Sequence, residues 1–204
     1  MGLYSNVIFP RFYDRMMDRP FWGKHRRDQL STARGSVLEI GVGTGLNLPH
    51  YPGHVEKITT VEPNPGMNRR LGRRSDQCGV RVDQRILSGE NLPFDEASFD
   101  CVVTTMTLCS VSDVSQVLAE IYRVLRPGGR YLFLEHGVSP DAKIARWQKR
   151  LNRFQRVFAD GCILDMPVPE AITAQPFSDF EVSTFYMKKT PRTHGYMYQG
   201  VAVK

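Results

Sequence analysis

The chain has 204 residues, of which 41% are hydrophobic, and a formal net charge of +6. This length allows one domain with a substantial core and is too short for two. No apolar stretch reaches the roughly 20 residues that span a bilayer, and the N-terminus lacks the continuous apolar run of an export signal. The four cysteines show no C-x-x-C pair or metal-type clustering. We therefore expect a reduced, cytoplasmic setting and no metal site.

Residues 1–34 are expected to form a basic, amphipathic helical segment that is interrupted near Pro10 and Pro20. Large apolar side chains recur at four-residue spacing between arginines, at Tyr4, Ile8, Phe12 and Met16. The segment either packs on the domain as an ordinary helix or covers a binding site as a lid. In the second case the side chains near the substrate are Tyr4, Phe12, Tyr13 and His25.

Three glycines in five residues follow the short apolar run 37–40, which reads as a buried parallel strand. Gly41, Gly43 and Gly45 let the backbone turn sharply and let a ligand approach it closely. The spacing differs from the G-x-G-x-x-G of dinucleotide-binding folds, and no Gly-Lys-Ser/Thr of a P-loop follows. The turn indicates a nucleotide-type pocket, although tight turns of this kind also serve packing alone.

The stretch from Glu39 to Gly45 resembles motif I of the class I S-adenosylmethionine (SAM) dependent methyltransferases, whose usual form is E/D-x-G-x-G-x-G. The resemblance implies that SAM is the cofactor. It further implies that Glu39 helps to hold the methionine end of SAM and that Gly41, Gly43 and Gly45 pass beneath it.

A second strand is expected at 58–62, and it ends in Glu62. An acid at the carboxyl end of this strand can accept hydrogen bonds from both hydroxyls of a ribose. We assign Glu62 that role; the alternative is an ordinary surface glutamate before Pro63. The helix expected at 65–77 carries several arginines, which indicate a solvated face.

The third expected strand, 80–87, is followed by a loop that resembles the D-A-E-x-L-P-F segment of the same family. In that family the loop backbone and its acid contact adenine. Ser88 stands at the position of the acid, so we assign adenine contact to the backbone around Gly89 and Glu90. We also assign Thr104, which ends the fourth strand at 99–104, to the cofactor site. No N/D-P-P-Y/F follows this strand, which argues against an enzyme that modifies nucleic-acid bases.

A helix is expected at 114–125, and Arg-Pro-Gly-Gly stops it before a fifth strand at 131–135. Leu-Arg-Pro-Gly-Gly before an aromatic strand resembles the small-molecule branch of the family. Two paired strands at 180–186 and 197–203 complete a Rossmann-like α/β fold. We expect a doubly wound seven-stranded sheet with an antiparallel last strand and helices on both faces, in one SAM-binding domain over 35–204.

Residues 36–204 resemble the animal thiol methyltransferases of the methyltransferase-like 7 group more closely. The similar segments are Leu108-Cys109-Ser110-Val111, Glu135-His136, Asp160-Gly161-Cys162 and the ending Gly200-Val201-Ala202-Val203-Lys204. Where those proteins carry a hydrophobic membrane-anchoring N-terminus, this chain has a short basic segment.

The resemblance implies a SAM-dependent methyltransferase for a small, apolar acceptor such as a thiol. A thiol with a pKa near ~8.5 needs one nearby base, for which His136 is the candidate. Cys109 is either near the substrate or a buried small apolar side chain. The first alternative is a phospholipid or quinone methyltransferase at an anionic membrane surface. A non-catalytic SAM-binding protein and an RNA methyltransferase are less favoured, and we expect no nucleic-acid partner.

The helix expected at 142–159 carries two stripes, one apolar and one basic. The apolar stripe is Trp147, Leu151, Phe154 and Phe158, and the basic stripe is Lys143, Arg146, Arg150 and Arg153. As a crossover helix it should pack its apolar stripe on the sheet and leave its cations solvated. The alternative is an interfacial surface that, with the N-terminal segment, binds anionic membranes reversibly.

Overall fold

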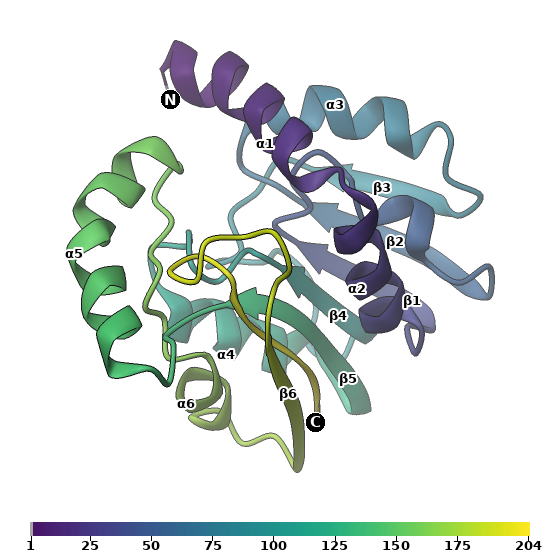
Figure 1. The fold of residues 1–204 in the computed structure, drawn as a ribbon. Helices are drawn as coiled ribbons and strands as arrows, with labels where there is room; N and C mark the ends of the chain where they lie inside the picture. The colour runs from purple at the N-terminus through teal and green to yellow at the C-terminus, as the bar shows by residue number, and fades with distance from the viewer. Residues whose placement is uncertain (1) are drawn as a thin grey trace.

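Seven strands form one mixed sheet in the order β3-β2-β1-β4-β5-β7-β6 (Figure 1). The strands are β1 (Gly35–Ile40), β2 (Val55–Val61), β3 (Arg81–Arg85), β4 (Phe99–Thr105), β5 (Leu125–His136), β6 (Asp179–Tyr186) and β7 (Tyr196–Val203). Strands β1 to β5 are parallel, and β7 is antiparallel to both β5 and β6. This computed structural model describes residues 2–204, so residue 1 of the expected lid segment lies outside it. The sheet confirms the expected fold.

The helices lie between the strands and ahead of β1. They are α1 (Phe9–Met17), α2 (Pro20–Leu30), α3 (Pro65–Ser75), α4 (Val114–Val124), α5 (Ala142–Phe158) and α6 (Val168–Thr173), with a π-helical turn at Tyr4–Ile8 before α1. Pro20 occupies the first turn of α2, where its missing N–H costs no hydrogen bond. Pro10 likewise sits in the first turn of α1, so the chain breaks at 18–19 and not at Pro10. None of the helices in residues 2–204 is long and apolar enough to cross a membrane.

Helices cover both faces of the sheet. Successive side chains of a strand point to opposite faces, so each strand contributes to the packing on both. On one face Leu38 and Ile40 of β1 pack with α4 and α6. On the other face Val37 of β1 packs with α2 and α3 through Leu30 and Leu71. A nearly continuous apolar run such as 37–40 is therefore what a strand buried on both sides requires.

Strand β5 begins at Leu125 and not at Tyr131, where the sequence suggested. The Arg-Pro-Gly-Gly segment does end α4, but it continues directly into the sheet, with Leu125 paired to Phe99 of β4. The backbone N–H of Gly128 donates to the carbonyl oxygen of Lys204 at 2.9 Å, and the N–H of Lys204 donates to the carbonyl oxygen of Gly129 at 3.1 Å. The C-terminus thus satisfies the backbone groups of the turn.

Helix α5 corrects an expectation: its apolar stripe does not pack on the sheet. Trp147, Phe154 and Phe158 are 54%, 61% and 64% exposed, and Gln148 is the buried residue of the helix. The Gln148 amide nitrogen donates to the carbonyl oxygens of Gly137 and Leu164, each at 2.9 Å. A polar anchor thus holds α5, which stands beside the strands in Figure 1 and does not lie across them.

Candidate cofactor and active site

A cavity of about 410 Å³ opens at the carboxyl ends of β1, β2 and β4. Its wall comes from segments 61–64, 88–90 and 110–112, from Gly41 and Gly43 after β1, and from Phe9 and Tyr13 of α1. The carboxyl edge of an open parallel sheet is where such folds bind their ligands, because the loops that follow adjacent strands meet there.

The glycine turn after β1 is shaped by close packing on one side and by the cavity on the other. A Cβ on Gly41, whose φ is +68°, would meet the side chain of Thr107 at 2.4 Å. Gly43, with φ +57°, lines the cavity, and the nearest atom to a Cβ there would be the Tyr13 ring at 3.7 Å. Gly45 does not line the cavity; a Cβ there would meet Leu71 of α3 at 2.8 Å. The third glycine therefore serves packing.

Glu62, directly after β2, lines the cavity and is 8% exposed. Its two carboxylate oxygens accept hydrogen bonds from the backbone N–H groups of Gly43 at 3.0 Å and Asn64 at 2.9 Å. Burial raises the pKa of Glu62, while these two N–H groups oppose the shift. Each oxygen keeps a free lone pair, so the carboxylate can also accept from two hydroxyl groups of a ligand.

The loop after β3 forms another part of the wall with Ser88, Gly89 and Glu90. A Cβ on Gly89 would meet Ile40 at 2.7 Å, so glycine lets this loop lie against the end of β1. Glu90 accepts a hydrogen bond from the backbone N–H of Ser112 at 3.0 Å. The cavity wall also contains the apolar side chains of Val61, Met67 and Val111. An acid for ribose hydroxyls and an apolar wall for a flat base fit the nucleoside of SAM.

Glu39 and Thr104 are not among the residues that line the cavity. Glu39 accepts hydrogen bonds from the Asn47 amide and the Tyr51 hydroxyl, both at 2.8 Å. Burial raises its pKa to about 7, against these two hydrogen bonds and the charge of Arg26. Thr104 shares a 2.8 Å hydrogen bond with the hydroxyl of Tyr131. Glu39 therefore holds the segment that follows the glycine turn, and Thr104 contacts β5.

Of the four residues expected in a lid, Tyr13 lines the cavity, together with Phe9 one helical turn before it. Phe9 was missed, although its spacing of four from Tyr13 puts both on one face of a helix. The Tyr4 hydroxyl donates to the carbonyl oxygen of Phe158 at 2.6 Å. Phe12 is 57% exposed, and the ring of His25 stacks on Phe185 with 4.3 Å between centroids. Phe12 and His25 are not part of the cavity wall.

Asp160, just beyond α5, ties the N-terminal turn to the cavity. The hydroxyl of Ser5 donates to the Asp160 carboxylate at 2.8 Å, and the Asn64 amide donates to the carbonyl oxygen of Ser5 at 2.9 Å. Asn64, Asp160 and Met106 all line the cavity and were not predicted. Only Asp160 carried a signal, as part of the Asp-Gly-Cys segment.

The charge of the cavity wall is negative. Glu62, Glu90 and Asp160 line it, and none of the described residues in the wall is a Lys, Arg or His. The wall suits a cationic or neutral ligand and offers no side-chain cation to a phosphate or carboxylate.

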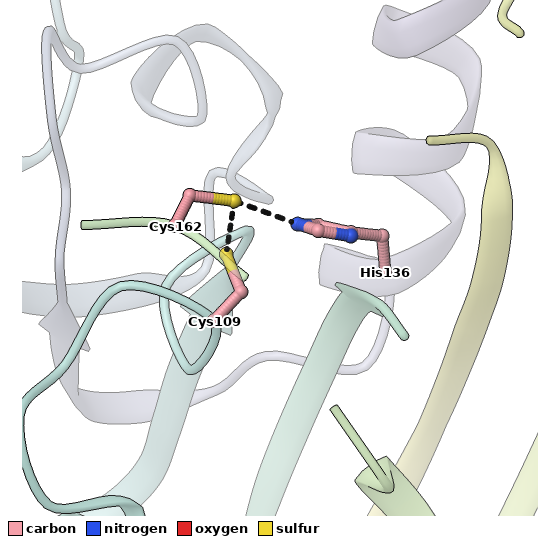
Figure 2. A group of neighbouring side chains, drawn as sticks. All are labelled: Cys109, His136 and Cys162. Carbon is pink, nitrogen blue, oxygen red and sulfur yellow. Dashed lines mark hydrogen bonds between the residues drawn. The ribbon is translucent and has the colours of Figure 1, made fainter. Parts of the chain in front are cut away.

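Cys109, His136 and Cys162 meet beside the cavity, from the loop after β4, the end of β5 and the loop after α5 (Figure 2). The Sγ atom of Cys162 lies 3.3 Å from Sγ of Cys109 and 3.2 Å from Nε2 of His136. All three residues are buried. The spacing of the cysteines in the sequence did not indicate this cluster, because the contact is made between segments that are distant in sequence.

The interactions within this cluster favour a negatively charged Cys162 beside a positively charged His136. The hydrogen bond with Cys109 lowers the pKa of Cys162 despite burial, and His136 adds to the effect. Burial alone would lower the pKa of His136, but the hydrogen bond to Cys162 and its charge raise it. His136 was predicted as a general base; its Nε2 contacts Cys162, and His136 is not among the residues of the cavity wall.

The doubly wound sheet, the glycine turn after β1 and the buried acid after β2 define the class: a Rossmann-like fold with a site for a nucleoside cofactor. A model of the methyltransferase domain matches residues 38–133. Thiol S-methyltransferase TMT1B of Rattus norvegicus is 35% identical over 151 residues, covering 72% of this chain and 62% of the relative. Phosphatidylethanolamine N-methyltransferase of Cereibacter sphaeroides is 31% identical over 144 residues, covering 70% of this chain and 69% of the relative.

Among solved structures, a SAM-dependent methyltransferase of Thermotoga maritima, a possible histamine N-methyltransferase, superimposes with a TM-score of 0.69. It is 23% identical and covers 97% of this chain and 98% of its own, which supports the fold. The chain belongs to the SAM-dependent methyltransferases. It spans 62–65% of the length of the thiol S-methyltransferases that it matches.

Proposed function

We propose that this chain transfers the methyl group of SAM to the sulfur of a small, apolar thiol. The observation that carries the proposal is the cavity wall, which combines apolar side chains with three acids and lacks a side-chain cation among its described residues. Once SAM, which brings one carboxylate of its own, is bound, such a wall offers no side-chain cation to a second carboxylate or to a phosphate, so it favours a neutral acceptor. The similarity to thiol S-methyltransferases over 72% of the chain supports the same acceptor class.

When bound, SAM supplies a methyl group on a sulfonium that already contains the leaving group. The protein therefore mainly has to bind, orient and exclude water. Glu62 would accept hydrogen bonds from the ribose, and the loop around Gly89 and Glu90 would contact the adenine. The negative wall favours the cationic sulfonium over its neutral product, which helps product release.

We propose that residues 1–34 act as a lid, with the ring of Tyr13 and its neighbour Phe9 closing the cavity from one side. Asp14 supports this arrangement, since its carboxylate lies 2.6 Å from Nη1 of Arg70 and 3.2 Å from Nη1 of Arg74. A lid held by ion pairs at its edge can exclude water during transfer and still open for exchange of ligands.

The test is methyl transfer from methyl-labelled SAM to a matched set of acceptors. The set comprises a small apolar thiol, the corresponding alcohol, a thiol that bears a carboxylate, phosphatidylethanolamine in vesicles, a quinol and RNA. We expect label in the apolar thiol at a rate at least tenfold above that of the carboxylate-bearing thiol. Transfer to the lipid, the quinol or RNA without transfer to any thiol would contradict the proposal.

A second candidate, methylation of a lipid or quinone-type acceptor at an anionic membrane surface, is favoured by exposed apolar side chains beside the cavity. Leu3, Ile8 and Phe12 of the N-terminal segment are 74%, 52% and 57% exposed. The N-terminal segment lies near the C-terminal end of α5 (Figure 1), and Phe154 and Phe158 of that helix are exposed. The hydrogen bond from Tyr4 to Phe158 joins the two segments.

The surrounding charge is complementary to anionic lipid. Helix α5 contains no acidic residue and exposes Lys143, Arg146, Lys149, Arg150, Arg153 and Arg156. Each cation near an anionic bilayer contributes on the order of 1 kcal/mol, and exposed aromatic rings add apolar contact. We expect the protein to sediment with phosphatidylserine vesicles at low salt, and to stay in solution with phosphatidylcholine vesicles or at high salt. Equal sedimentation with both vesicles would contradict the charge-based surface.

A further inference from the structure

The cluster of Cys109, His136 and Cys162 has the composition of a site for a soft divalent cation. One donor atom from each residue lies within 4.8 Å of the other two, and Figure 2 shows the three side chains pointing toward one another. Two sulfurs and one imidazole nitrogen suit Zn²⁺ among the common biological cations, since Mg²⁺ and Ca²⁺ prefer oxygen. Two thiolates would also neutralise the charge of the ion in this buried position.

The three donors are held in place by backbone contacts that do not depend on a ligand. His136 is the last residue of β5 and pairs with Met197 of β7. The N–H of Ile163 donates to the carbonyl oxygen of Cys109 at 2.9 Å, which links the loops that carry the two cysteines. The N–H of Cys162 donates to the carbonyl oxygen of Ala159 at 3.1 Å. A site whose donors are fixed in this way loses little conformational entropy when it binds an ion.

Three side chains provide donor atoms at this site. Within residues 2–204, the group of His, Cys, Asp and Glu side chains that could share one ion here contains only these three members. Structural Zn²⁺ sites have four protein ligands, whereas catalytic sites have three and keep the fourth position for water or substrate. Three donors therefore indicate a site with an exchangeable position.

The cluster adjoins the wall of the cavity on two sides. Ser110, which follows Cys109, and Asp160, which precedes Cys162 by two residues, both line the cavity. The Sγ atom of Cys109 also lies 3.8 Å from the carbonyl oxygen of Met106, another residue of the wall. An ion held by the cluster would sit next to the space that the acceptor enters.

We propose that Cys109, His136 and Cys162 bind Zn²⁺ and leave its fourth position to the sulfur of the acceptor thiol. The inference rests on the proposed thiol S-methylation and adds to it the group that activates the thiol. Coordination releases the thiol proton to solvent and holds the acceptor as a thiolate. His136 then acts as a metal ligand and not as the general base that the sequence suggested.

The transfer step balances without a redox partner. A bond forms between the acceptor sulfur and the methyl carbon, and the bond between that carbon and the sulfonium sulfur breaks. The electron pair of the broken bond remains on the cofactor sulfur, which becomes a neutral thioether. The methylated acceptor is also a neutral thioether, a poorer ligand than a thiolate, so it can leave the ion.

The test is a Co²⁺ titration of the metal-free full chain, reduced with a phosphine under nitrogen, because Co²⁺ replaces Zn²⁺ and is visible in absorption. We expect one Co²⁺ per chain, a thiolate-to-cobalt charge-transfer band, and a change in the visible bands when ethanethiol is added. Cys109→Ser and Cys162→Ser should each weaken Co²⁺ binding at least tenfold. The matched control is Cys78→Ser, which lies outside the cluster and should bind like the wild type.

Circular dichroism and binding of S-adenosylhomocysteine verify that each variant is folded; if a serine variant is not, His136→Gln takes its place. Lack of Co²⁺ uptake by the wild type, or bands that ethanethiol leaves unchanged, would overturn the inference. So would thiol methylation at an undiminished rate after a chelator has removed all metal, a result that leaves the proposed function intact. If Co²⁺ and ethanethiol bind as expected but no thiol is methylated, the metal site stands and the proposed function fails.

Discussion

At the scale of single residues, the proposed cofactor site depends most on Glu62. Its carboxylate is fixed by the backbone N–H groups of Gly43 and Asn64, so its orientation is set before a ligand binds. This arrangement joins the turn after β1 to the end of β2, two segments that also line the cavity. Loss of the carboxylate would therefore remove the proposed contact to the ribose and also loosen the turn.

We therefore expect Glu62→Ala to weaken binding of S-adenosylhomocysteine by about 1–3 kcal/mol, the usual cost of losing hydrogen bonds to a charged acceptor. Isothermal titration calorimetry measures the difference. Glu56→Ala is the matched control, because Glu56 is on the same strand and exposed. Equal affinities of Glu62→Ala and the wild type would remove Glu62 from the site.

Glu39 gives a pH dependence with a defined sign. Burial raises its pKa to about 7, whereas a glutamate in an unfolded chain titrates near ~4.3. Between these values the folded chain holds a proton that the unfolded chain has lost. The contribution of this group to stability is fully present below the unfolded pKa and is lost as the pH rises through about 7.

Glu39→Gln, which cannot ionise, should gain stability relative to the wild type by on the order of 2 kcal/mol between about pH 5.5 and about pH 8. Urea unfolding at the two pH values measures this difference. Glu181→Gln, at an exposed position of β6, should show no such change. A pH-independent difference between Glu39→Gln and the wild type would show that Glu39 is ionised in the folded chain throughout.

At the scale of elements, Asp14 links α1 to α3 and to the turn after β1, beside the apolar contacts of the buried Met17. This carboxylate is 13% exposed, bonds to Thr44 and pairs with Arg70 and Arg74 of α3. Because the arginines are partly exposed, we place the strength of each pair nearer to that of surface pairs than to that of fully buried ones.

Asp14→Asn should therefore loosen α1 and speed cleavage by trypsin after Arg11 and Arg15 several-fold, with little loss of global stability. Binding of S-adenosylhomocysteine should weaken as Phe9 and Tyr13 leave the wall. Asp18→Asn is the control, since Asp18 is 68% exposed and lies 3.5 Å from Arg74. Identical digestion patterns for Asp14→Asn and the wild type would show that other contacts hold α1.

For the exposed face of α5, we expect substitutions that weaken membrane binding and leave the free energy of unfolding nearly unchanged. Phe154→Ser with Phe158→Ser should change the free energy of unfolding by about 0.5 kcal/mol or less, as for surface positions, because both rings are exposed. The same pair of changes should reduce sedimentation with phosphatidylserine vesicles at least several-fold. Val182→Ser, an exposed apolar position on β6, is the control. Unchanged vesicle binding would mean that these rings do not contact the membrane, and strong destabilisation would mean that they pack against protein.

At the scale of the whole molecule, the sheet and its order of elements were predictable, because apolar runs such as 37–40 and 99–104 alternate with helical periodicity. The helix 142–159 was predicted in extent but not in packing. Its periodicity revealed an apolar stripe, but periodicity does not show whether that stripe packs against another part of the protein. The deciding residue was Gln148, whose buried hydrogen bonds depend on loops distant in sequence.

The candidate site also has residues that the sequence predicts and residues that it does not. Glu62, Gly41 and Gly43 follow from local spacing at strand ends, and all three line the cavity. Glu39 and Thr104 sit in strands, where one residue decides which side of the sheet a side chain reaches. Contacts between distant loops, such as that of Cys109 with Cys162, leave no trace in spacing. The sequence therefore predicted the parts of the cavity wall that lie in single segments, including Gly89 and Glu90 after β3, and did not predict the contacts between segments.

The central claim is that the cavity between the glycine turn and Glu62 binds SAM. A crystal structure of the full chain grown with saturating S-adenosylhomocysteine tests it most directly. We expect density for one ligand per chain in this cavity, with both ribose hydroxyls within about 3 Å of the Glu62 carboxylate and the adenine against the loop around Gly89. Ligand density at another place, or a cavity without ligand at saturating concentration, would contradict the account.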